Sequence, residues 1–217
     1  MIEPGDLRLG LPLRSNFAYI LNLRKDFVRA EQLLQKNLQL TYQFKNFQTT
    51  ASILFELGRV ALATQRIELA IEYIQKSLNL LSELGETKNL PMHHLYLGKC
   101  FTARSDLPAA HDQFREVIKT GQEFKHFQMV YWGLVNNGRI YMLEGQTEKA
   151  LGIALALRHY PIEFIRIKEE GDRLLADLQD ELPQWQVEAA MQQMDSQFSP
   201  DPAGANALAY ALKRDME

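Results

Sequence analysis

Cysteine is almost missing from this sequence: Cys100 is the only one among 217 residues. A single thiol cannot form an intramolecular disulfide, and it cannot supply the clustered thiolates of a structural zinc site. Disulfide scaffolds and thiolate-bound zinc domains are therefore excluded. Because Cys100 adjoins Phe101 in a helical pattern, we expect it to be part of the core.

Long apolar runs are missing as well. No stretch approaches the ~18 consecutive apolar residues expected of a membrane-spanning helix. The first residues, Met1 to Asp6, lack the basic segment and the apolar core of a signal peptide. With 46% hydrophobic and 24% charged residues, the composition is that of a well-packed protein that does not bind membranes. We expect a cytoplasmic location.

A concentrated basic surface is also not indicated by the sequence. Residues 1–160 carry 19 basic and 15 acidic side chains, whereas residues 161–217 carry 5 and 12. The two parts therefore have charges of +4 and −7, which together give the net charge of −3. Phosphate recognition needs clustered positive charge, so we expect no direct binding to nucleic acid.

Signatures of catalysis and of metal binding are not found either. The sequence has no phosphate-binding loop, no dinucleotide-binding glycine motif, no G-x-S-x-G and no H-E-x-x-H. His93 and His94 are neighbours, and adjacent helical residues point about 100° apart, so they cannot both ligate one metal ion. The acidic pair Glu169 and Glu170 is typical of a solvent-exposed helix face. We predict a protein that is not an enzyme and has no cofactor and no metal.

A gap-free repeat of 40 residues is the main positive feature. Two columns of small residues and two columns of mostly bulky residues recur with this spacing, which indicates two packed helices in each unit. The small columns are Ala18, Gly58, Gly98, Gly138 and Ala30, Ala70, Ala110, Ala150. The bulky columns are Leu21, Ala61, Phe101, Tyr141 and Leu34, Ile74, Phe114, Ala154.

The repeat predicts the organisation of the whole chain. We expect an all-α fold in which about four helix-turn-helix repeats stack into a continuous array and further helices cap its C-terminal end. Pro91 suits the first turn of a helix, Gly85 suits a helix end, and Asp26 suits an N-cap. The spacing of apolar residues predicts a helix from about Phe47 to Ala63, and a short terminal helix is expected over residues 207–213. The sequence does not determine whether this terminal helix docks. The predicted segments are a leader (1–10), four repeats (11–50, 51–90, 91–130, 131–160), capping helices (161–197), and a linker with a short terminal helix (198–217).

The repeats resemble the tetratricopeptide (TPR) signature. It is best carried by Leu57-Gly58-Arg59, Leu97-Gly98-Lys99 and Asn137-Gly138-Arg139, each followed twelve residues after its glycine by an alanine. The units are longer than the usual ~34 residues, Ala18 replaces the first glycine, and the terminal proline is missing. The resemblance implies a right-handed α–α superhelix, that is, a TPR-like solenoid that binds other molecules in a concave groove.

A more specific resemblance covers roughly residues 10–185. The long repeats, the segment 154–161 and the segment 171–183 look like the MalT-like helical sensors at the C-terminus of bacterial STAND signal-transduction ATPases and transcriptional activators. This likeness implies a sensor or interaction arm of a larger regulatory protein. The nucleotide-binding and DNA-binding parts would then lie outside this sequence.

The residues expected to face the groove come from the first helix of each repeat. The position after the small residue is Tyr19, Arg59, Lys99 or Arg139, so three cations would form a ladder. The other candidates are Phe55, Tyr96, Trp132 and Asn136. Cations among aromatic rings suit an acidic or C-terminal peptide, or a phosphorylated or carboxylated small molecule. Alternatively, the cations are solvated or paired with acids such as Glu56.

Two functions of different classes follow. The first is a non-catalytic sensor or protein-interaction domain that binds a peptide, a protein or a small inducer in the groove. The second is a constitutive scaffold or self-association adaptor that senses nothing, which the opposite charges of the two ends would favour. An enzyme would need a deep polar pocket, which repeat proteins rarely provide.

Overall fold

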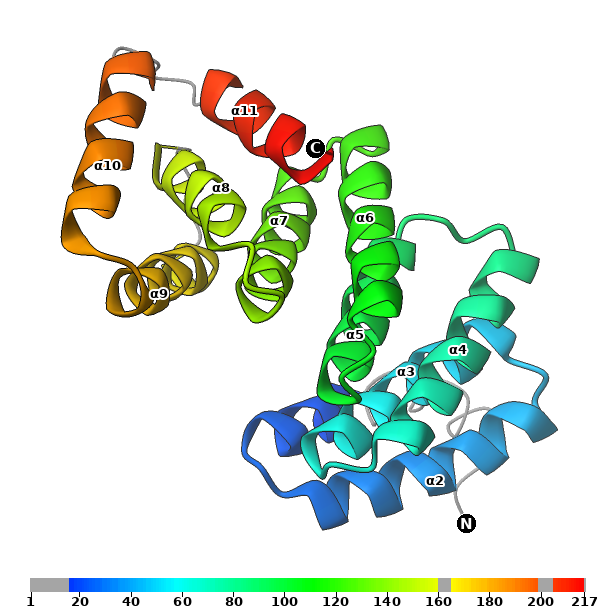
Figure 1. Ribbon diagram of the computed structural model, residues 1–217. Coiled ribbons are helices and arrows are strands. Elements are labelled where there is room, and N and C mark those ends of the chain that lie inside the picture. The colour runs from blue at the N-terminus through cyan, green and yellow to red at the C-terminus, as the bar shows by residue number, and fades with distance from the viewer. Residues whose placement is uncertain (1–15, 160–164, 199–204, 217) are drawn as a thin grey trace. The chain divides into compact units, whose positions relative to one another are not determined.

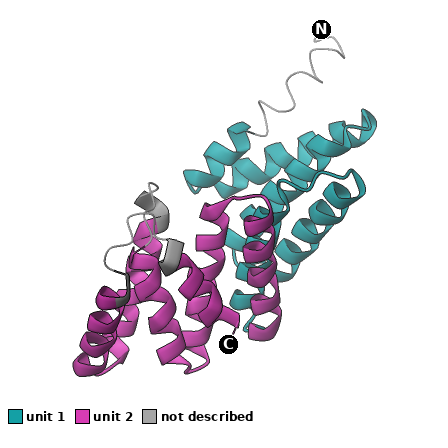
Figure 2. Ribbon diagram, turned by 90° about the horizontal axis from the view of Figure 1, so that it is seen from above, with its two compact units in different colours: residues 1–106 teal, residues 107–217 magenta. Residues whose placement is uncertain are grey.

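The computed structural model describes residues 16–159, 165–198 and 205–216. Helices form nearly all of these residues, and no strand occurs within them. The chain divides into two compact units, residues 1–106 and 107–217 (Figure 2). The boundary falls inside the third predicted repeat, and the predicted leader lies outside the described residues.

Unit 1 is a succession of antiparallel helices in which each helix packs on the next one in the chain. It begins with the helical residues 16–23, and α3 packs against both α2 and α4 (Figure 1). The remaining helices are α2 (Phe27–Gln43), α3 (Phe47–Ala63), α4 (Ile67–Glu83) and α5 (Leu90–Ala103). The predicted proline lies in the first turn of α5, where its missing N–H group costs no helical hydrogen bond.

Unit 2 begins with helices of the repeat and continues with helices that depart from it. Here α7 packs against α6 and α8, while α9 packs against α7 and α8 and α10 packs against α8. The helices are α6 (Leu107–Glu123), α7 (Phe127–Leu143), α8 (Thr147–His159), α9 (Ile165–Glu181), α10 (Gln184–Phe198) and α11 (Ala205–Met216).

The turns recur every 20 residues, which is half of the sequence repeat. In each of these turns, between residues 23 and 147, one residue has a positive φ, and the N–H group that follows it donates to the carbonyl oxygen five residues earlier, as from Arg66 to Ala61 at 2.9 Å. This is the Schellman arrangement, which satisfies carbonyl groups at a helix end. The two helices of a repeat thus end in the same way. The positive-φ residues are Lys25, Lys45, Gln65, Gly85, Ser105, Lys125 and Gly145.

The small-residue columns allow close helix contacts, as the sequence predicted. Ala30, Ala70, Ala110 and Ala150 are fully buried. A Cβ atom added to Gly58 would lie 2.4 Å from Cγ1 of Ile74, so α3 and α4 touch at this point. Gly138 instead faces Leu174 of the capping helix α9. Asp26 occupies the N-cap position of α2, as predicted, but makes no side-chain cap hydrogen bond, whereas the N-cap Asn46 of α3 accepts one from the Thr49 N–H at 3.1 Å.

The terminal helix α11 docks onto unit 2, a point that the sequence left open. It packs on α8 and α7, with Leu208 and Ala211 buried. Its Asp215 is also buried, where Asn137 Nδ2 donates to Asp215 Oδ1 at 2.8 Å and Tyr141 Oη donates to the Asp215 carbonyl oxygen at 2.9 Å. The helix is therefore held by polar as well as apolar contacts.

Candidate functional site in unit 1

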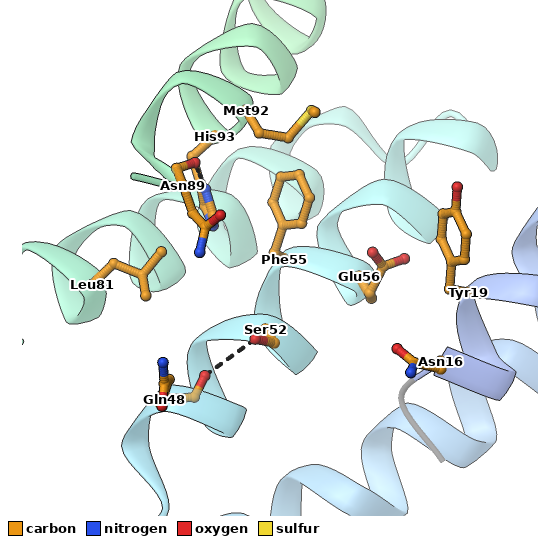
Figure 3. Close-up of a pocket in the computed structure, with 10 residues that line it drawn as sticks. All are labelled: Asn16, Tyr19, Gln48, Ser52, Phe55, Glu56, Leu81, Asn89, Met92 and His93. Atoms are coloured by element: carbon orange, nitrogen blue, oxygen red, sulfur yellow. Dashed lines mark hydrogen bonds between the residues drawn. The ribbon is translucent and has the colours of Figure 1, made fainter. Parts of the chain in front are cut away.

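A cavity of about 270 Å³ opens in unit 1 (Figure 3). Its walls come mainly from the helical residues 16–23, from α3 and from the start of α5, which are the first helices of successive repeats. Helix α4 contributes a single residue. The ten lining residues are Asn16, Tyr19, Gln48, Ser52, Phe55, Glu56, Leu81, Asn89, Met92 and His93.

Helix α3 forms the largest part of the wall. Gln48, Ser52 and Phe55 follow one another at helical spacings of four and three residues, so they share one face of α3. The opposite face of α3 carries the buried residues Ile53, Leu57 and Val60, which pack against α2 and its neighbours. The same amphipathic pattern that builds the core therefore leaves this face open to a ligand.

The Arg59 guanidinium contacts residues of the cavity wall and is enclosed by three aromatic rings from three helices. Its central carbon lies 4.9 Å from the ring centre of Tyr19, 5.1 Å from that of Tyr96 and 6.0 Å from that of Phe55. Arg59 also donates to Glu56 Oε1 at 2.8 Å, and its side chain is only 15% exposed. Such cation–π contacts are strongest where the cation is desolvated. Arg59 is therefore held inside unit 1 and does not line the cavity.

Glu56 is the charged residue of the cavity wall. Its side chain is 14% exposed, and burial raises the pKa of its carboxyl group, a shift that the Arg59 guanidinium and the Asn22 side chain oppose. Oε1 accepts from Arg59, but no hydrogen bond of ordinary length and angle reaches the buried Oε2 from any described residue. Figure 3 shows this carboxylate between the rings of Phe55 and Tyr19.

His93 supports the aromatic part of the cavity. Its ring lies 4.2 Å from the ring of Phe55, and its two nitrogens contact the Asn89 carbonyl oxygen and Ser77 Oγ, each at 2.9 Å. Burial lowers the pKa of His93, which favours the neutral imidazole. The Ser77–His93 pair could suggest a nucleophile and its base, but Ser77 is fully buried and cannot meet a substrate. The pair links α4 to α5.

The eight predicted groove residues are divided between the two units. Tyr19 and Phe55 line the cavity. Arg59 and Tyr96 contact each other and do not line it, and the Lys99 ammonium group lies 5.3 Å from the ring centre of Tyr96. The other three, Trp132, Asn136 and Arg139, belong to unit 2.

In unit 2 the predicted positions are engaged by the chain itself. Arg139 forms an ion pair with Glu170 of α9. Asn136 is buried, and its Nδ2 donates to the Trp132 carbonyl oxygen at 2.7 Å. The alternative that the sequence left open, pairing of the cations with acids, is thus what the structure shows for Arg59 and for Arg139.

Sequence reasoning missed several lining residues that repeat columns could have indicated. Asn16 and Glu56 occupy the same 40-residue column as Tyr96 and Asn136, which were predicted. Ser52 and Met92 likewise share the column of Trp132. No such signal exists for Leu81 and Asn89, because they reach the cavity through the end of α4 and the loop after it.

Within residues 16–159, 165–198 and 205–216, no group of three or more His, Cys, Asp or Glu side chains could hold a metal ion. None of the described helices is both long enough and apolar enough to span a bilayer. Cys100 is fully buried, as predicted, and burial raises the pKa of its thiol to about 12.

The comparison with known families concerns the segment that carries most of the cavity wall. Residues 49–123 match the tetratricopeptide repeat family. This segment therefore has TPR-type repeats, and the predicted all-α fold of the TPR type is confirmed. A search of curated proteins found no relative.

Two solved structures share the fold over almost the entire chain. One contains the nearly identical TPR-like repeats of a protein from Podosopora anserina described as a kinesin light chain, with a TM-score of 0.63 and 13% identity, covering 99% of this chain and 98% of that one. The other is BtubC (BKLC) from P. vanneervenii, with a TM-score of 0.60 and 14% identity, covering 99% of this chain and 83% of that one. At these identities the likeness concerns the fold alone.

Proposed function

We propose that this TPR domain binds an extended peptide segment of a partner protein in the cavity of unit 1 and that it is not an enzyme. The cavity itself carries this proposal. It lies on the first helices of successive repeats and combines the exposed faces of Phe55 and Met92 with the amide side chains of Asn16, Gln48 and Asn89. Amide groups can pair with a peptide backbone, and apolar faces can bury its side chains.

The regulatory context that the resemblance implies belongs to the same proposal. In that context the chain is the sensor arm of a larger bacterial signalling ATPase, and occupancy of the cavity is passed on to the rest of the protein. A small inducer could take the place of the peptide. The context is tested by the sequence that flanks this chain in its parent protein, which should contain a nucleotide-binding module.

A blocking substitution tests whether the cavity binds peptides. Ser52 is exposed, lines the cavity and donates to the carbonyl oxygen four residues earlier. Ser82 is also exposed and makes the same hydrogen bond on α4, but it does not line the cavity. The variants Ser52→Trp and Ser82→Trp therefore place the same indole inside and outside the site.

Peptides selected from a displayed random library against the wild-type chain should bind Ser82→Trp with unchanged affinity and Ser52→Trp at least ~10-fold more weakly, since the indole fills space that the peptide needs. Fluorescence anisotropy with labelled peptides measures both affinities. Selection of no binding peptide, or equal loss of affinity in both variants, would show that the cavity is not the binding site.

The opposite charges of residues 1–160 and 161–217 support a second candidate, self-association as a scaffold. Light scattering at low and at high salt measures the molar mass in solution. Assembly driven by these charges should be present at low salt and should weaken as salt screens them. A monomeric mass at every salt concentration would remove this candidate.

A further inference from the structure

We propose that the cavity of unit 1 receives a basic side chain, lysine or arginine, of the bound peptide and places its cationic group against Glu56. This inference rests on the proposed function and names the chemistry of the partner. It differs from the expectation of an acidic partner, which depended on a ladder of accessible cations.

The charge of the wall is the first argument. Among the ten lining residues Glu56 is the one that carries a formal charge at neutral pH, since His93 is buried as a neutral ring. The Arg59 guanidinium pairs with Glu56 and is enclosed by three rings, and Arg59 is not among the lining residues. An anionic group in the cavity would therefore meet the Glu56 carboxylate, while the cation that pairs with this carboxylate does not line the cavity.

The second carboxylate oxygen of Glu56 also favours a cation. A carboxylate can accept hydrogen bonds at both oxygens. Here Oε1 accepts from Arg59 and the Asn22 side chain lies near the carboxyl group, but no hydrogen bond of ordinary length and angle reaches the buried Oε2 from any described residue. Leaving a buried charged acceptor unsatisfied is costly, and a charge-assisted hydrogen bond from an ammonium or guanidinium group would remove that cost.

The surroundings of Glu56 favour a cation with an aliphatic stem. Figure 3 shows the carboxylate between the rings of Tyr19 and Phe55, and aromatic faces attract cations. Phe55, Leu81 and Met92 supply the apolar wall beside it. Lysine and arginine side chains bury their methylene groups on such surfaces and keep the charged end at a polar partner.

The inference is tested first on the wild-type chain, with three capped amino acids as probes. N-acetyl-lysine methylamide, N-acetyl-norleucine methylamide and N-acetyl-glutamate methylamide share the backbone and differ in the side-chain end. Affinities come from the shifts of backbone amide signals of Ser52, Phe55 and Glu56 in NMR titrations. The lysine probe should bind ~10-fold more tightly than the norleucine probe, the effect of one charge-assisted hydrogen bond. The glutamate probe should bind most weakly.

The variant Glu56→Gln removes the charge and keeps the shape of the side chain. It should reduce the preference for lysine over norleucine to less than ~2-fold, while norleucine binding stays within ~2-fold of the wild-type value. Ser82→Gln is the control and should keep the full preference. Glu56→Gln also leaves Arg59 without its ionic partner, so far-UV circular dichroism is used to check that the variant is folded. The comparison of the three probes on the wild-type chain does not depend on this variant.

Free n-butylamine is a control ligand that distinguishes a site for a peptide side chain from a site for a free amine. It carries the ammonium group without the amide groups, so it should bind more weakly than the lysine probe. Tighter binding of n-butylamine would assign the site to a free amine and overturn the inference of a peptide side chain.

The outcomes separate this inference from the proposed function. If library peptides bind in a manner sensitive to Ser52→Trp but norleucine or glutamate binds as well as lysine, the cavity is a peptide site and the inference about charge is wrong. If the preference for lysine persists in Glu56→Gln, Glu56 is not its origin. If Ser52→Trp does not weaken the binding of library peptides, the cavity is not a peptide site, and both the proposed function and the inference that rests on it are wrong.

Discussion

The close contact at Gly58 leads to a prediction whose sign can be worked out from the structure. The change is Gly58→Ala, in the middle of α3. The added methyl group would lie 2.4 Å from Ile74 Cγ1 and 3.2 Å from the Ala70 carbonyl oxygen, and both Ile74 and Ala70 are fully buried in α4. Cγ1 is bonded to the branched Cβ atom, so rotation of the Cδ1 end about χ2 leaves it in place and cannot relieve the contact. Either α3 and α4 separate or Ile74 leaves its rotamer.

Two opposing effects set the magnitude. Alanine is about 1 kcal/mol more favourable than glycine inside a helix. Overpacking a filled core costs about 1–3 kcal/mol, and a clash with a backbone-proximal carbon and a carbonyl oxygen belongs in the upper part of that range. The free energy of unfolding of unit 1 should therefore fall by about 1–2 kcal/mol.

Urea denaturation followed by circular dichroism at 222 nm measures this change. Both tryptophans, Trp132 and Trp185, lie in unit 2, so fluorescence reports on that unit separately. The matched control is Gly152→Ala in α8, where the new methyl group meets the movable end of Arg214 at 3.1 Å. This control should leave unit 2 unchanged or stabilise it by up to ~1 kcal/mol.

A second variant tests the cause of the loss. Ile74→Ala alone should cost about 2–5 kcal/mol because it opens a cavity. Combined with Gly58→Ala, it should cost at least ~1 kcal/mol less than the sum of the two single changes, since the new methyl group enters the vacated space. Additive costs, or a Gly58→Ala variant as stable as the wild type, would refute the reasoning from close packing.

Three further changes test other features of the fold. Gly85→Ala should lower the free energy of unfolding of unit 1 by about 1 kcal/mol from the backbone alone, because its φ is +71° and no atom lies within 4 Å of the added methyl group; thermal melting measures it. Asn37→Leu should stabilise unit 1 by about 1–2 kcal/mol in urea denaturation, because both side-chain polar atoms of Asn37 are buried without a hydrogen bond from the described residues. Burial raises the pKa of Asp215 above 3.8, so its protonated form is favoured in the folded state, and this stabilisation is complete below pH ~3.8 and lost as the pH rises through the raised pKa. Compared with Asp215→Asn, the wild type should therefore gain stability in unit 2 as the pH falls from 7 to 4, and a difference between the two that is independent of pH would contradict this.

The helices could be predicted closely because their determinants are local. The sequence pattern predicted a helix over residues 47–63, and α3 has these bounds. Spacing of apolar residues and a turn at a fixed register suffice for such a prediction. The structure extended α11 beyond the predicted residues 207–213, to Ala205–Met216. Its docking could not be predicted, because Asp215 and Asn137 are 78 residues apart in the chain.

The candidate site was predicted only in part. Tyr19 and Phe55 were identified because aromatic residues on the first helices stand out in a repeat alignment. The role of Arg59 depended on its neighbours. In the sequence, a cation after the glycine is equally compatible with an exposed row of cations and with a buried ion pair. The structure shows the buried pair, because the rings of Tyr19 and Tyr96 and the carboxylate of Glu56 enclose the Arg59 guanidinium.

By itself, the sequence determined the type of fold, because a 40-residue period of small and bulky side chains can be buried only by stacking helices on their neighbours. It also determined where most helices begin and end, since those signals lie within a few residues of each boundary. The tertiary structure alone decided which faces stay open. A cavity requires side chains from three helices to leave space between them, and whether a charge is accessible or enclosed depends on contacts between residues that are distant in the chain.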